Sequence, residues 1–398
     1  MDHNTKILIP FGQGLDIVVA EAAPTATVSV DLLDSLNNVL AEDLFADADM
    51  PPFNKSAMDG YACRKEDLGN ELMIIEEIPA GSVPNKTISK NECARIMTGA
   101  MVPEGADFVL MKEFANRISI DTIRCTKITD HPNICYRAED VTKGDQILNK
   151  GTLLNPAHIA VMASIGIHHP LVFARPMVAV ISTGNELVEP SVIPHLQQIR
   201  NSNGSQLMAQ LKRMGIEADY LGILKDNESE VWSGLASATQ KYDIVLISGG
   251  VSVGDYDFVP AVLDRLGAKI LRHGLNVKPG KHLLFAKLGN KAIFGLPGNP
   301  VSSFVQFELL VKPFILRQMG CARLPARLKS PLAADFNRQK ANNLLFVPVT
   351  FTFDGTVLPI EYHGSAHIHA YTGANGILEI PEGQYALKKG EIVYVRQL

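Results

Sequence analysis

The feature that most constrains the fold is a regular alternation of apolar runs and amphipathic segments over residues 176–322. MVAVIST and YDIVLIS are short and apolar, whereas SNGSQLMAQLKRMGI and DFVPAVLDRLGA repeat apolar residues at helical spacing. Strands that are apolar throughout are typical of a sheet covered by helices on both faces. The alternation therefore predicts a parallel α/β domain over residues 176–322.

The segments on either side of this domain have a different pattern of apolar and polar residues. Between 47 and 137, strand-like pieces such as ELMIIEEI are separated by Gly, Pro and Asn, which predicts a β-rich domain. Apolar residues at helical spacing predict a helix over 31–43. We expect residues 1–46 and 138–175 to form one small mixed linking domain, into which the β-rich domain is inserted. Short β-like pieces after 322 predict a C-terminal β-barrel-like domain over 323–398.

Composition agrees with several folded domains and excludes some classes of function. The chain has 398 residues, of which 46% are hydrophobic and 20% charged. Its 37 Lys and Arg against 42 Asp and Glu leave a net charge of −5, which offers no bulk attraction to nucleic acid or to an anionic membrane. No signal-peptide pattern and no run of about 18 apolar residues is present. The five cysteines have no Cys-x-x-Cys spacing, which favours a reducing cytoplasm.

A glycine-rich loop follows one predicted strand in YDIVLISGGVSVGDYDFVP. Backbone N–H groups of glycines approach an anion closely, and the start of the next helix adds partial positive charge. An ordinary glycine-rich turn between strand and helix is an equally good interpretation of this motif alone. The hypothesis of a phosphate cradle assigns four residues as ligands: Gly249, Gly250, Ser252 and Gly254.

Acidic residues near this loop point to a divalent cation. The carboxylates of Asp255 and Asp257 would repel a phosphate unless a cation lay between the acids and the phosphate. The more specific hypothesis is therefore a phosphate bridged to these acids by Mg²⁺. Glu186 and Asp226 also follow predicted strands, and ligands of open parallel sheets bind at the carboxyl ends of the strands. Each acid alone is more often a helix cap or a solvated loop residue. As a set, the candidate metal ligands are Glu186, Asp226 and Asp257.

Two further loops carry candidate anion ligands. Lys278 and Lys281 flank the turn of VKPGK, although lysines in a turn are usually only exposed surface. The turn in GLPGNPVSS precedes a long amphipathic helix, and a helix start favours anions. A plain turn with capping serines explains this segment equally well. The candidate residues of the second loop are Pro297, Gly298, Asn299, Pro300 and Ser302.

The predicted β-rich domain contributes one carboxylate and one hydroxyl on glycine-flanked loops. Asp59 precedes Gly60 in SAMDGYA, and Thr98 precedes Gly99 in MTGA. Both dipeptides favour turns, so a purely structural role is open.

Together, these blocks resemble the MoeA family of molybdopterin molybdenumtransferases, which includes the E domain of gephyrin. The likeness extends through ARIMTGAMVPEGADFVLMKE, AEDVTKGD, SGGVSVGDYD, VKPGK and GLPGNPVSS, in that order. It implies an enzyme that inserts molybdate into adenylylated molybdopterin with release of AMP, for which the Mg²⁺ inferred from the acids above would serve. It also implies four domains per subunit, and a homodimer whose sites lie between the α/β domain of one subunit and the β-rich domain of the other. The functional acids and hydroxyls implied by the motifs are Asp59, Thr98, Asp140, Glu186, Asp226 and Asp257, and the phosphate or oxyanion contacts are Ser252, Lys278, Lys281 and Ser302.

The sequence departs from the family pattern at three places. His282 stands where the family often has proline, Ala138 where glycine is common, and LLFVPV lacks an arginine usual after the phenylalanine. These departures leave an alternative open: a non-catalytic or specialised scaffold that binds molybdopterin, or a protein that takes tungstate. The resemblance also suggests docking of other enzymes of molybdenum-cofactor biosynthesis.

Overall fold

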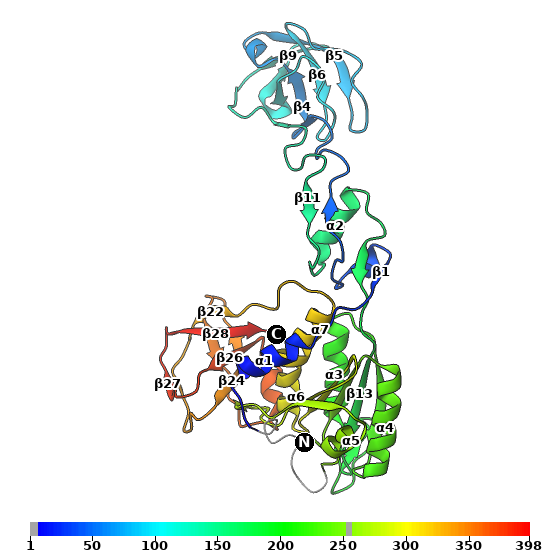
Figure 1. Ribbon diagram of the computed structural model, residues 1–398. Helices are drawn as coiled ribbons and strands as arrows, with labels where there is room; N and C mark the ends of the chain where they lie inside the picture. The colour runs from blue at the N-terminus through cyan, green and yellow to red at the C-terminus, as the bar shows by residue number, and fades with distance from the viewer. Residues whose placement is uncertain (1–6, 252–256) are drawn as a thin grey trace. The chain divides into compact units, whose positions relative to one another are not determined.

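The computed structural model describes residues 7–251 and 257–398, so Ser252, Gly254 and Asp255 of the glycine loop lie outside the described residues. The chain divides into two compact units (Figure 1). Unit 1 comprises the residues up to Glu42, Lys150–Ile159 and His169–Leu398, and unit 2 comprises Asp43–Asn149 and Ala160–His168. The fold is mixed α/β and β, and no helix of the described residues combines the length and hydrophobicity needed to cross a bilayer.

The largest element of unit 1 is a mixed six-stranded sheet. Its order is β16-β13-β17-β21-β20-β18, and the first four strands are parallel. The prediction of a parallel sheet is wrong for β20, which runs antiparallel to both of its neighbours, β21 and β18. The reason is local, because a two-residue turn joins β20 to β21, and such a turn connects only antiparallel strands. The bounds are β13 Val178–Thr183, β16 Ala218–Leu224, β17 Ile244–Ser248, β18 Lys269–His273, β20 Leu284–Leu288 and β21 Lys291–Leu296.

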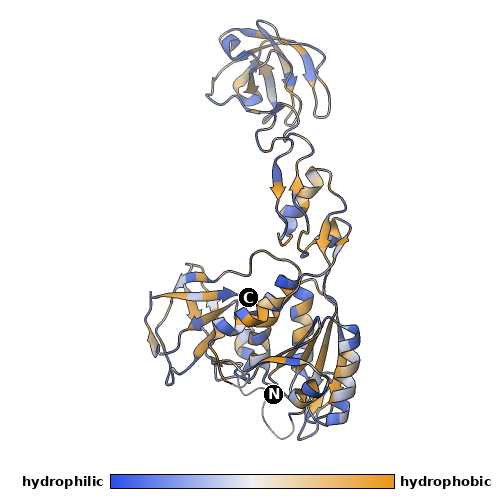
Figure 2. Cartoon of the chain, in the orientation of Figure 1, coloured by the Kyte–Doolittle hydropathy of each residue, from blue (hydrophilic) through white to orange (hydrophobic). Residues whose placement is uncertain are grey.

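Helices cover both faces of this sheet. Successive residues of a strand point to opposite faces. Val180 therefore belongs to the same core as Leu207 of α3, whereas Ile181 packs in the core of Leu235 of α4. Figure 1 shows these two helices on either side of β13, and Figure 2 shows that the strands between them are hydrophobic. The helices are α3 Ser202–Arg213, α4 Glu228–Lys241, α5 Val259–Arg265, and α6 Pro300–Gln306, which continues through the π-helical turn Phe307–Val311 into α7 Lys312–Gln318.

The predicted helix over 31–43 is wrong. The chain forms only a 3₁₀ turn at Leu33–Ser35 and then runs extended. Val39 and Leu40 bridge Leu153 and Val172 and are buried by this strand-like pairing, whereas Leu33 and Leu36 of the expected helical stripe are exposed. The other elements of this region are α1 Phe11–Ala20, β1 Thr27–Ser29, α2 Pro156–Ser164, β12 Leu171–Phe173, β14 Leu187–Val188 and β15 Ile199–Arg200.

The C-terminal strands close into a ring. The ladder runs β24-β26-β28-β22, and Leu332, just after β22, bridges Val357 of β25, which pairs with β24. β19 adds to the free side of β24 and so joins this module to the α/β part. The bounds are β19 Val277–Lys278, β22 Leu328–Pro331, β23 Phe336–Asn337, β24 Leu344–Phe351, β25 Val357–Pro359, a 3₁₀ turn Ile368–Tyr371, β26 Gly376–Ile380, β27 Ala386–Leu387 and β28 Ile392–Gln397.

Unit 2 is built on a second six-stranded sheet of order β7-β4-β6-β5-β9-β8. Its strands are β4 Gly60–Cys63, β5 Glu71–Ile78, β6 Glu92–Ile96, β7 Phe108–Met111, β8 Ala115–Arg117 and β9 Thr122–Cys125. Short elements complete it: β2 Leu44–Phe45, β3 Lys55–Ser56, β10 Ile134–Cys135, β11 Gln146–Leu148, and 3₁₀ turns at Lys65–Asp67 and Lys112–Phe114.

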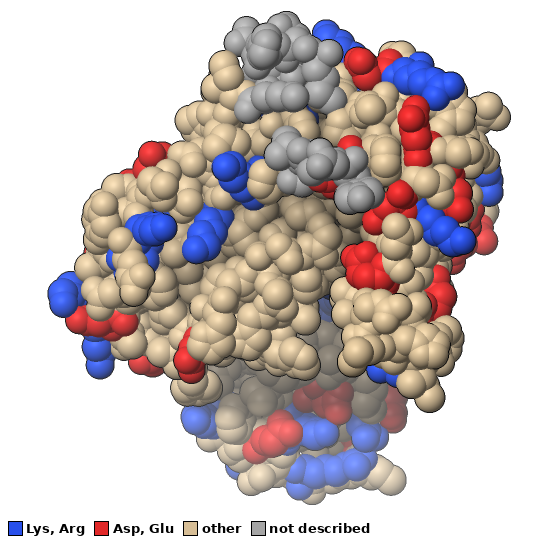
Figure 3. Space-filling model, turned by 90° about the horizontal axis from the view of Figure 1, so that it is seen from below, with Lys and Arg blue, Asp and Glu red and all other residues tan. Residues whose placement is uncertain are grey.

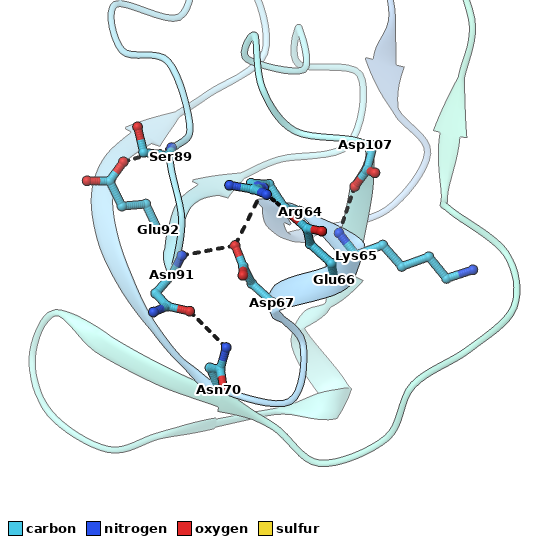
Figure 4. A network of polar contacts seen from close by, with 9 residues as sticks. All are labelled: Arg64, Lys65, Glu66, Asp67, Asn70, Ser89, Asn91, Glu92 and Asp107. Carbon is cyan, nitrogen blue, oxygen red and sulfur yellow. Dashed lines mark hydrogen bonds and ion pairs between the residues drawn. The ribbon is translucent and has the colours of Figure 1, made fainter.

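A polar network fastens one turn of unit 2 to its sheet (Figure 4). The buried Asp67 carboxylate accepts a hydrogen bond from the Asn91 N–H (2.9 Å) and lies 3.7 Å from the Arg64 side chain. The Asn70 amide donates to the Asn91 side-chain oxygen at 2.9 Å. Because each buried polar atom here has a partner, we assign the network a structural role.

Candidate functional site

Three of the predicted acids follow the α/β sheet at its carboxyl edge. β13 and β16 are parallel, so Glu186 and Asp226, which follow them, leave the sheet at the same edge. Asn185 links the two loops, since its N–H donates to Asp226 Oδ2 (3.3 Å) and its side-chain oxygen accepts from the Asp226 N–H (3.2 Å). Asp257 follows β17, the third parallel strand.

The charges of these three acids act on one another. The pKa of the Asp226 carboxyl is raised, first by its burial and then by the negative charges of Glu186 and Asp257. Among the described residues, no three or more His, Cys, Asp or Glu side chains are placed so that they could hold a metal ion by themselves. The donor set nevertheless fits Mg²⁺, which is usually held by one or two carboxylates together with substrate phosphates.

The raised pKa of Asp226 predicts that Asp226→Asn stabilises the protein in the absence of metal. A carboxyl whose pKa is higher in the folded state than in the unfolded state stabilises the fold at pH values below its unfolded-state pKa. This stabilisation is lost as the pH rises through its folded-state pKa. At pH 7 the wild type therefore holds a destabilising carboxylate that the variant lacks. We expect the Tm at pH 7 to rise by no more than a few degrees, because the group is partly solvated. At pH 3, below the usual Asp value of 3.8, the difference should vanish.

Thermal melts of both proteins in chelator at the two pH values check this expectation. A variant that is less stable than the wild type at pH 7 but not at pH 3 would contradict the assigned crowding of negative charge.

The start of the glycine loop is fixed against the sheet. Gly249 has φ +97° and donates its N–H to the Leu296 carbonyl at 3.0 Å. A Cβ at Gly249 would overlap the Thr183 carbonyl oxygen of the neighbouring strand. Gly250 also has a positive φ, +63°. The backbone thus leaves β17 in a conformation that favours glycine and brings it against β13.

Asn203 is a site residue that sequence reasoning missed. It is buried in the first turn of α3, and its amide nitrogen donates to Ser248 Oγ (2.7 Å) and to the Gly298 carbonyl (2.8 Å). One side chain therefore links the end of β17, where the glycine loop begins, to the turn at residues 297–300 after β21, which we call the PGNP turn. The only sequence signal is a second asparagine two residues after Asn201, whose side chain caps α3 by accepting from the Gly204 N–H.

The predicted basic residues line a pocket of about 190 Å³ in unit 1, which we call the KPGK pocket. Gly280, in the turn between the two lysines, has φ +94°, and its carbonyl accepts a hydrogen bond from the buried Gln306 amide of α6. The PGNP turn and α6 thus build one wall and hold the turn that forms the other. The lining is Val277, Lys278, Pro279, Gly280, Lys281, His282, Pro297, Asn299, Ser302 and Ser365.

Two lining residues change the expected chemistry of this pocket. His282 has a lowered pKa, mainly because it is partly buried and next because Lys281 and His273 repel a proton, so it is neutral at pH 7. Ser365 was not predicted, and it enters the pocket because its carbonyl accepts the Val301 N–H (3.0 Å) at the start of α6. Figure 3 shows one face of the protein, on which most Asp and Glu side chains gather on one side while Lys and Arg are spread over both. The negative charge of Asp257 acts in the opposite direction on His282 and raises its pKa, so the pocket interacts electrostatically with the acidic edge, as we call Glu186, Asp226 and Asp257.

Unit 2 has its own constellation around Asp59. Thr98 donates both its N–H (2.9 Å) and its hydroxyl (2.8 Å) to Asp59 Oδ1, and Lys112 lies 3.1 Å from Oδ2. These contacts lower the pKa of Asp59 to about 2, so it is ionised at any physiological pH. The structure thus joins the predicted Asp59 and Thr98. Asp140 is exposed, and within the described part of the chain no side-chain contact connects it to this pair.

Comparison with known proteins accounts for nearly the whole chain. Residues 9–166 match the MoeA N-terminal region (domain I and II), residues 179–317 a probable molybdopterin binding domain, and residues 329–398 the MoeA C-terminal region (domain IV). A relative from Staphylococcus epidermidis strain ATCC 35984, named molybdopterin molybdenumtransferase, is 38% identical over 408 residues, covering 99% of this chain and 97% of the relative. One of the same name from Staphylococcus aureus strain MSSA476 is 36% identical over 401 residues, covering 97% and 94%.

A solved structure gives the same result for the fold. The molybdopterin biosynthesis moeA protein from Pyrococcus horikoshii OT3 superposes with a TM-score of 0.81 at 31% identity, covering 98% of this chain and all of the other. The molybdenum cofactor biosynthesis protein from Pyrococcus furiosus, at 23% identity and a TM-score of 0.63, shares the fold. Sequence blocks, domain matches and fold agree from end to end, and the chain belongs to the MoeA family.

Proposed function

We propose that this protein is a molybdopterin molybdenumtransferase, which inserts molybdate into adenylylated molybdopterin with hydrolytic release of AMP. The observation that carries the proposal is that a small pocket with two lysines interacts electrostatically with the acidic edge, through Asp257 and the pocket residue His282. A small basic pocket suits a tetrahedral dianion, and an acidic edge suits a cation-bridged phosphate. The names of the full-length relatives supply the substrate class.

Residues of the acidic edge would bind and activate the phosphate. Asp226 and Asp257 would hold Mg²⁺ together with the substrate phosphates. Glu186 would orient the other ligands of the Mg²⁺ ion or the attacking water. When bound, the ion neutralises phosphate charge and polarises the phosphorus. Gly249 and Gly250 supply close backbone approach, and Asn203 keeps that loop against the PGNP turn.

Residues of the KPGK pocket would hold the oxyanion beside the dithiolene sulfurs. Lys278 and Lys281 attract the dianion, and the Ser302 and Ser365 hydroxyls are within the same lining. Binding both reactants in fixed geometry lowers the entropic part of the barrier. The mechanism needs no covalent intermediate on the protein.

The decisive experiment measures products directly. Purified protein, adenylylated molybdopterin, Mg²⁺ and molybdate are mixed, and AMP and metallated pterin are quantified by mass spectrometry. Molybdate-dependent formation of both supports the transferase. Binding of the pterin without release of AMP would support the scaffold alternative, which the names of the relatives do not favour. Tungstate in place of molybdate tests oxyanion choice.

We further propose a cytoplasmic homodimer whose active site combines the Asp59 constellation of one subunit with the acidic edge of the other. The support is the family resemblance, together with the presence of two carboxylate constellations in separate units of the chain. In this arrangement Asp59 and Thr98 act across the dimer on the substrate held by the partner's α/β module.

Mixing two inactive variants tests the shared site. Asp59→Ala subunits and Asp257→Ala subunits should regain activity when combined, because each mixed dimer has one intact and one doubly damaged site. Random exchange predicts at most about a quarter of wild-type AMP release, since half the dimers are mixed and each has one working site of two. Native mass spectrometry should confirm exchange first. Mixed dimers without activity would place the complete site within one chain.

A further inference from the structure

The KPGK pocket has the size and charge of a site for a small dianion. Its volume is about 190 Å³, whereas pockets that enclose drug-sized ligands span ~300–1,000 Å³. Lys278 and Lys281 are both exposed and supply two positive charges, which balance a dianion such as molybdate. Lysine is a flexible point charge, so the two ammonium groups attract the ion but do not fix its orientation. Orientation requires a further donor on a more rigid part of the wall.

His282 lies on a part of the wall where the backbone is held on both sides. The Lys281 carbonyl, just before it, accepts a hydrogen bond from the Leu275 N–H at 2.9 Å. The Leu283 carbonyl, just after it, accepts the Gly274 N–H at 2.8 Å. The Leu283 side chain is fully buried, which anchors the chain as it leaves the pocket. The backbone of His282 is therefore fixed before any ligand binds.

The ring of His282 has no hydrogen-bond partner in the described part of the chain. Over residues 7–251 and 257–398, neither ring nitrogen donates to or accepts from another group, and the pKa of the side chain responds only to burial and to nearby charges. The side chain is partly buried and lines the pocket. Polar groups that are removed from water normally have a partner. The ring nitrogens of His282 are therefore available to a ligand in the pocket.

The charge state of His282 suits a pocket that already has two cations. Burial lowers the pKa of its ring most, Lys281 and His273 lower it further, and the charge of Asp257 only partly offsets them. The ring is therefore neutral at pH 7 and has one N–H to donate. A hydrogen bond to an ion is stronger than one between neutral groups, so this N–H can orient a dianion without adding a third positive charge.

We propose that His282 orients the oxyanion in the KPGK pocket, as a neutral donor whose ring N–H binds one oxygen of molybdate. The inference rests on the proposed function for the identity of the ion. It gives His282 a role separate from that of the lysines, because Lys278 and Lys281 supply charge and His282 supplies a fixed direction. His282 thereby determines how tightly the pocket holds a tetrahedral oxyanion.

Binding of molybdate to the intact protein, measured by calorimetry at pH 7 without pterin, tests this role. His282→Ala should raise the Kd about tenfold, the loss expected when one hydrogen bond to a charged group is removed. His282→Gln and His282→Asn keep a neutral N–H at the reach of Nε2 and of Nδ1, so at least one of them should stay within about threefold of the wild type. His369→Ala, which removes an exposed histidine outside the pocket lining, is the matched control and should bind as the wild type does.

Failure of the wild type to bind molybdate would overturn the proposal, because a preformed pocket should bind the ion without pterin. Equal molybdate affinity of the wild type and His282→Ala would also overturn it. The same holds for an equal loss in the Ala, Gln and Asn variants, since the missing N–H would then not be the cause. Without molybdate, the Tm of each variant should match the wild type, because the ring gives up no hydrogen bond within the described residues.

The pH dependence separates a neutral donor from a cation. Molybdate and the lysines keep their charges between pH 7 and pH 8.5, so the difference in Kd between the wild type and His282→Ala should be the same at both values. A difference that disappears at pH 8.5 would show that the ring binds the ion as an imidazolium, which contradicts the role of a neutral donor.

Activity assays separate failure of this role from failure of the proposed function. If His282→Ala releases AMP in a molybdate-dependent reaction with an unchanged KM for molybdate, the transferase stands and the assignment of His282 is wrong. If molybdate binds through His282 but the wild type never releases AMP from the pterin nucleotide, the role of His282 stands and the transferase is wrong.

Discussion

Asp257→Asn should lower the rate of molybdate-dependent AMP release at least about tenfold at saturating substrate, while the fold stays intact. The substitution keeps the shape of the side chain and removes one of the negative charges that surround Asp226. If Asp257 holds Mg²⁺ with the substrate phosphates, an amide is a much poorer ligand for this hard cation. Tenfold corresponds to about 1.4 kcal/mol of lost transition-state stabilisation, a modest demand on a charged metal ligand.

The measurement is a turnover assay by mass spectrometry over a range of Mg²⁺ concentrations, with Tm recorded for each protein. Asp16→Asn, which removes an exposed carboxylate from α1, is the matched control and should behave as the wild type. Partial recovery of Asp257→Asn at high Mg²⁺ would indicate weakened metal binding. Full turnover at every Mg²⁺ concentration would remove Asp257 from the mechanism.

Gly249→Ala should abolish activity and lower the free energy of unfolding by at least about 2 kcal/mol more than Gly267→Ala. Both glycines have a positive φ, +97° and +80°, so each substitution carries a backbone strain of roughly 1–2 kcal/mol. Open space surrounds a Cβ at Gly267, whereas at Gly249 it overlaps the Thr183 carbonyl oxygen of β13. The carbonyl belongs to a buried strand and cannot move without disturbing the sheet.

Urea unfolding of the two variants separates strain from overlap, because the strain is common to both. An equal loss of stability would show that the end of β17 yields to the extra methyl group. In that case the close approach of the glycine loop to β13 is not a constraint on the site. AMP release from the two variants, measured under native conditions, reports whether the loop still binds substrate.

Local sequence patterns were reliable where one element decides its own structure. The apolar runs at 178–183 and 244–248 are buried strands, and the periodic segment at 202–213 is a helix capped by Asn201. Asp59 and Thr98, recognised on separate glycine-flanked loops, are joined by two hydrogen bonds. The helix expected over 31–43 is absent because Val39 and Leu40 are buried by pairing with Leu153 and Val172, which lie more than a hundred residues later.

The sequence by itself determined which family this chain belongs to, which segments are strands, and which acids and lysines are candidates, because residue type and short-range spacing carry this information. Tertiary structure alone decided the clamp made by Asn203 and the entry of Ser365 into the KPGK pocket. Each of these depends on groups that meet only after the chain folds back over tens of residues, and no local propensity encodes such a meeting. The raised pKa of Asp226 has the same origin, since burial and the charges of Glu186 and Asp257 act through space and not along the chain.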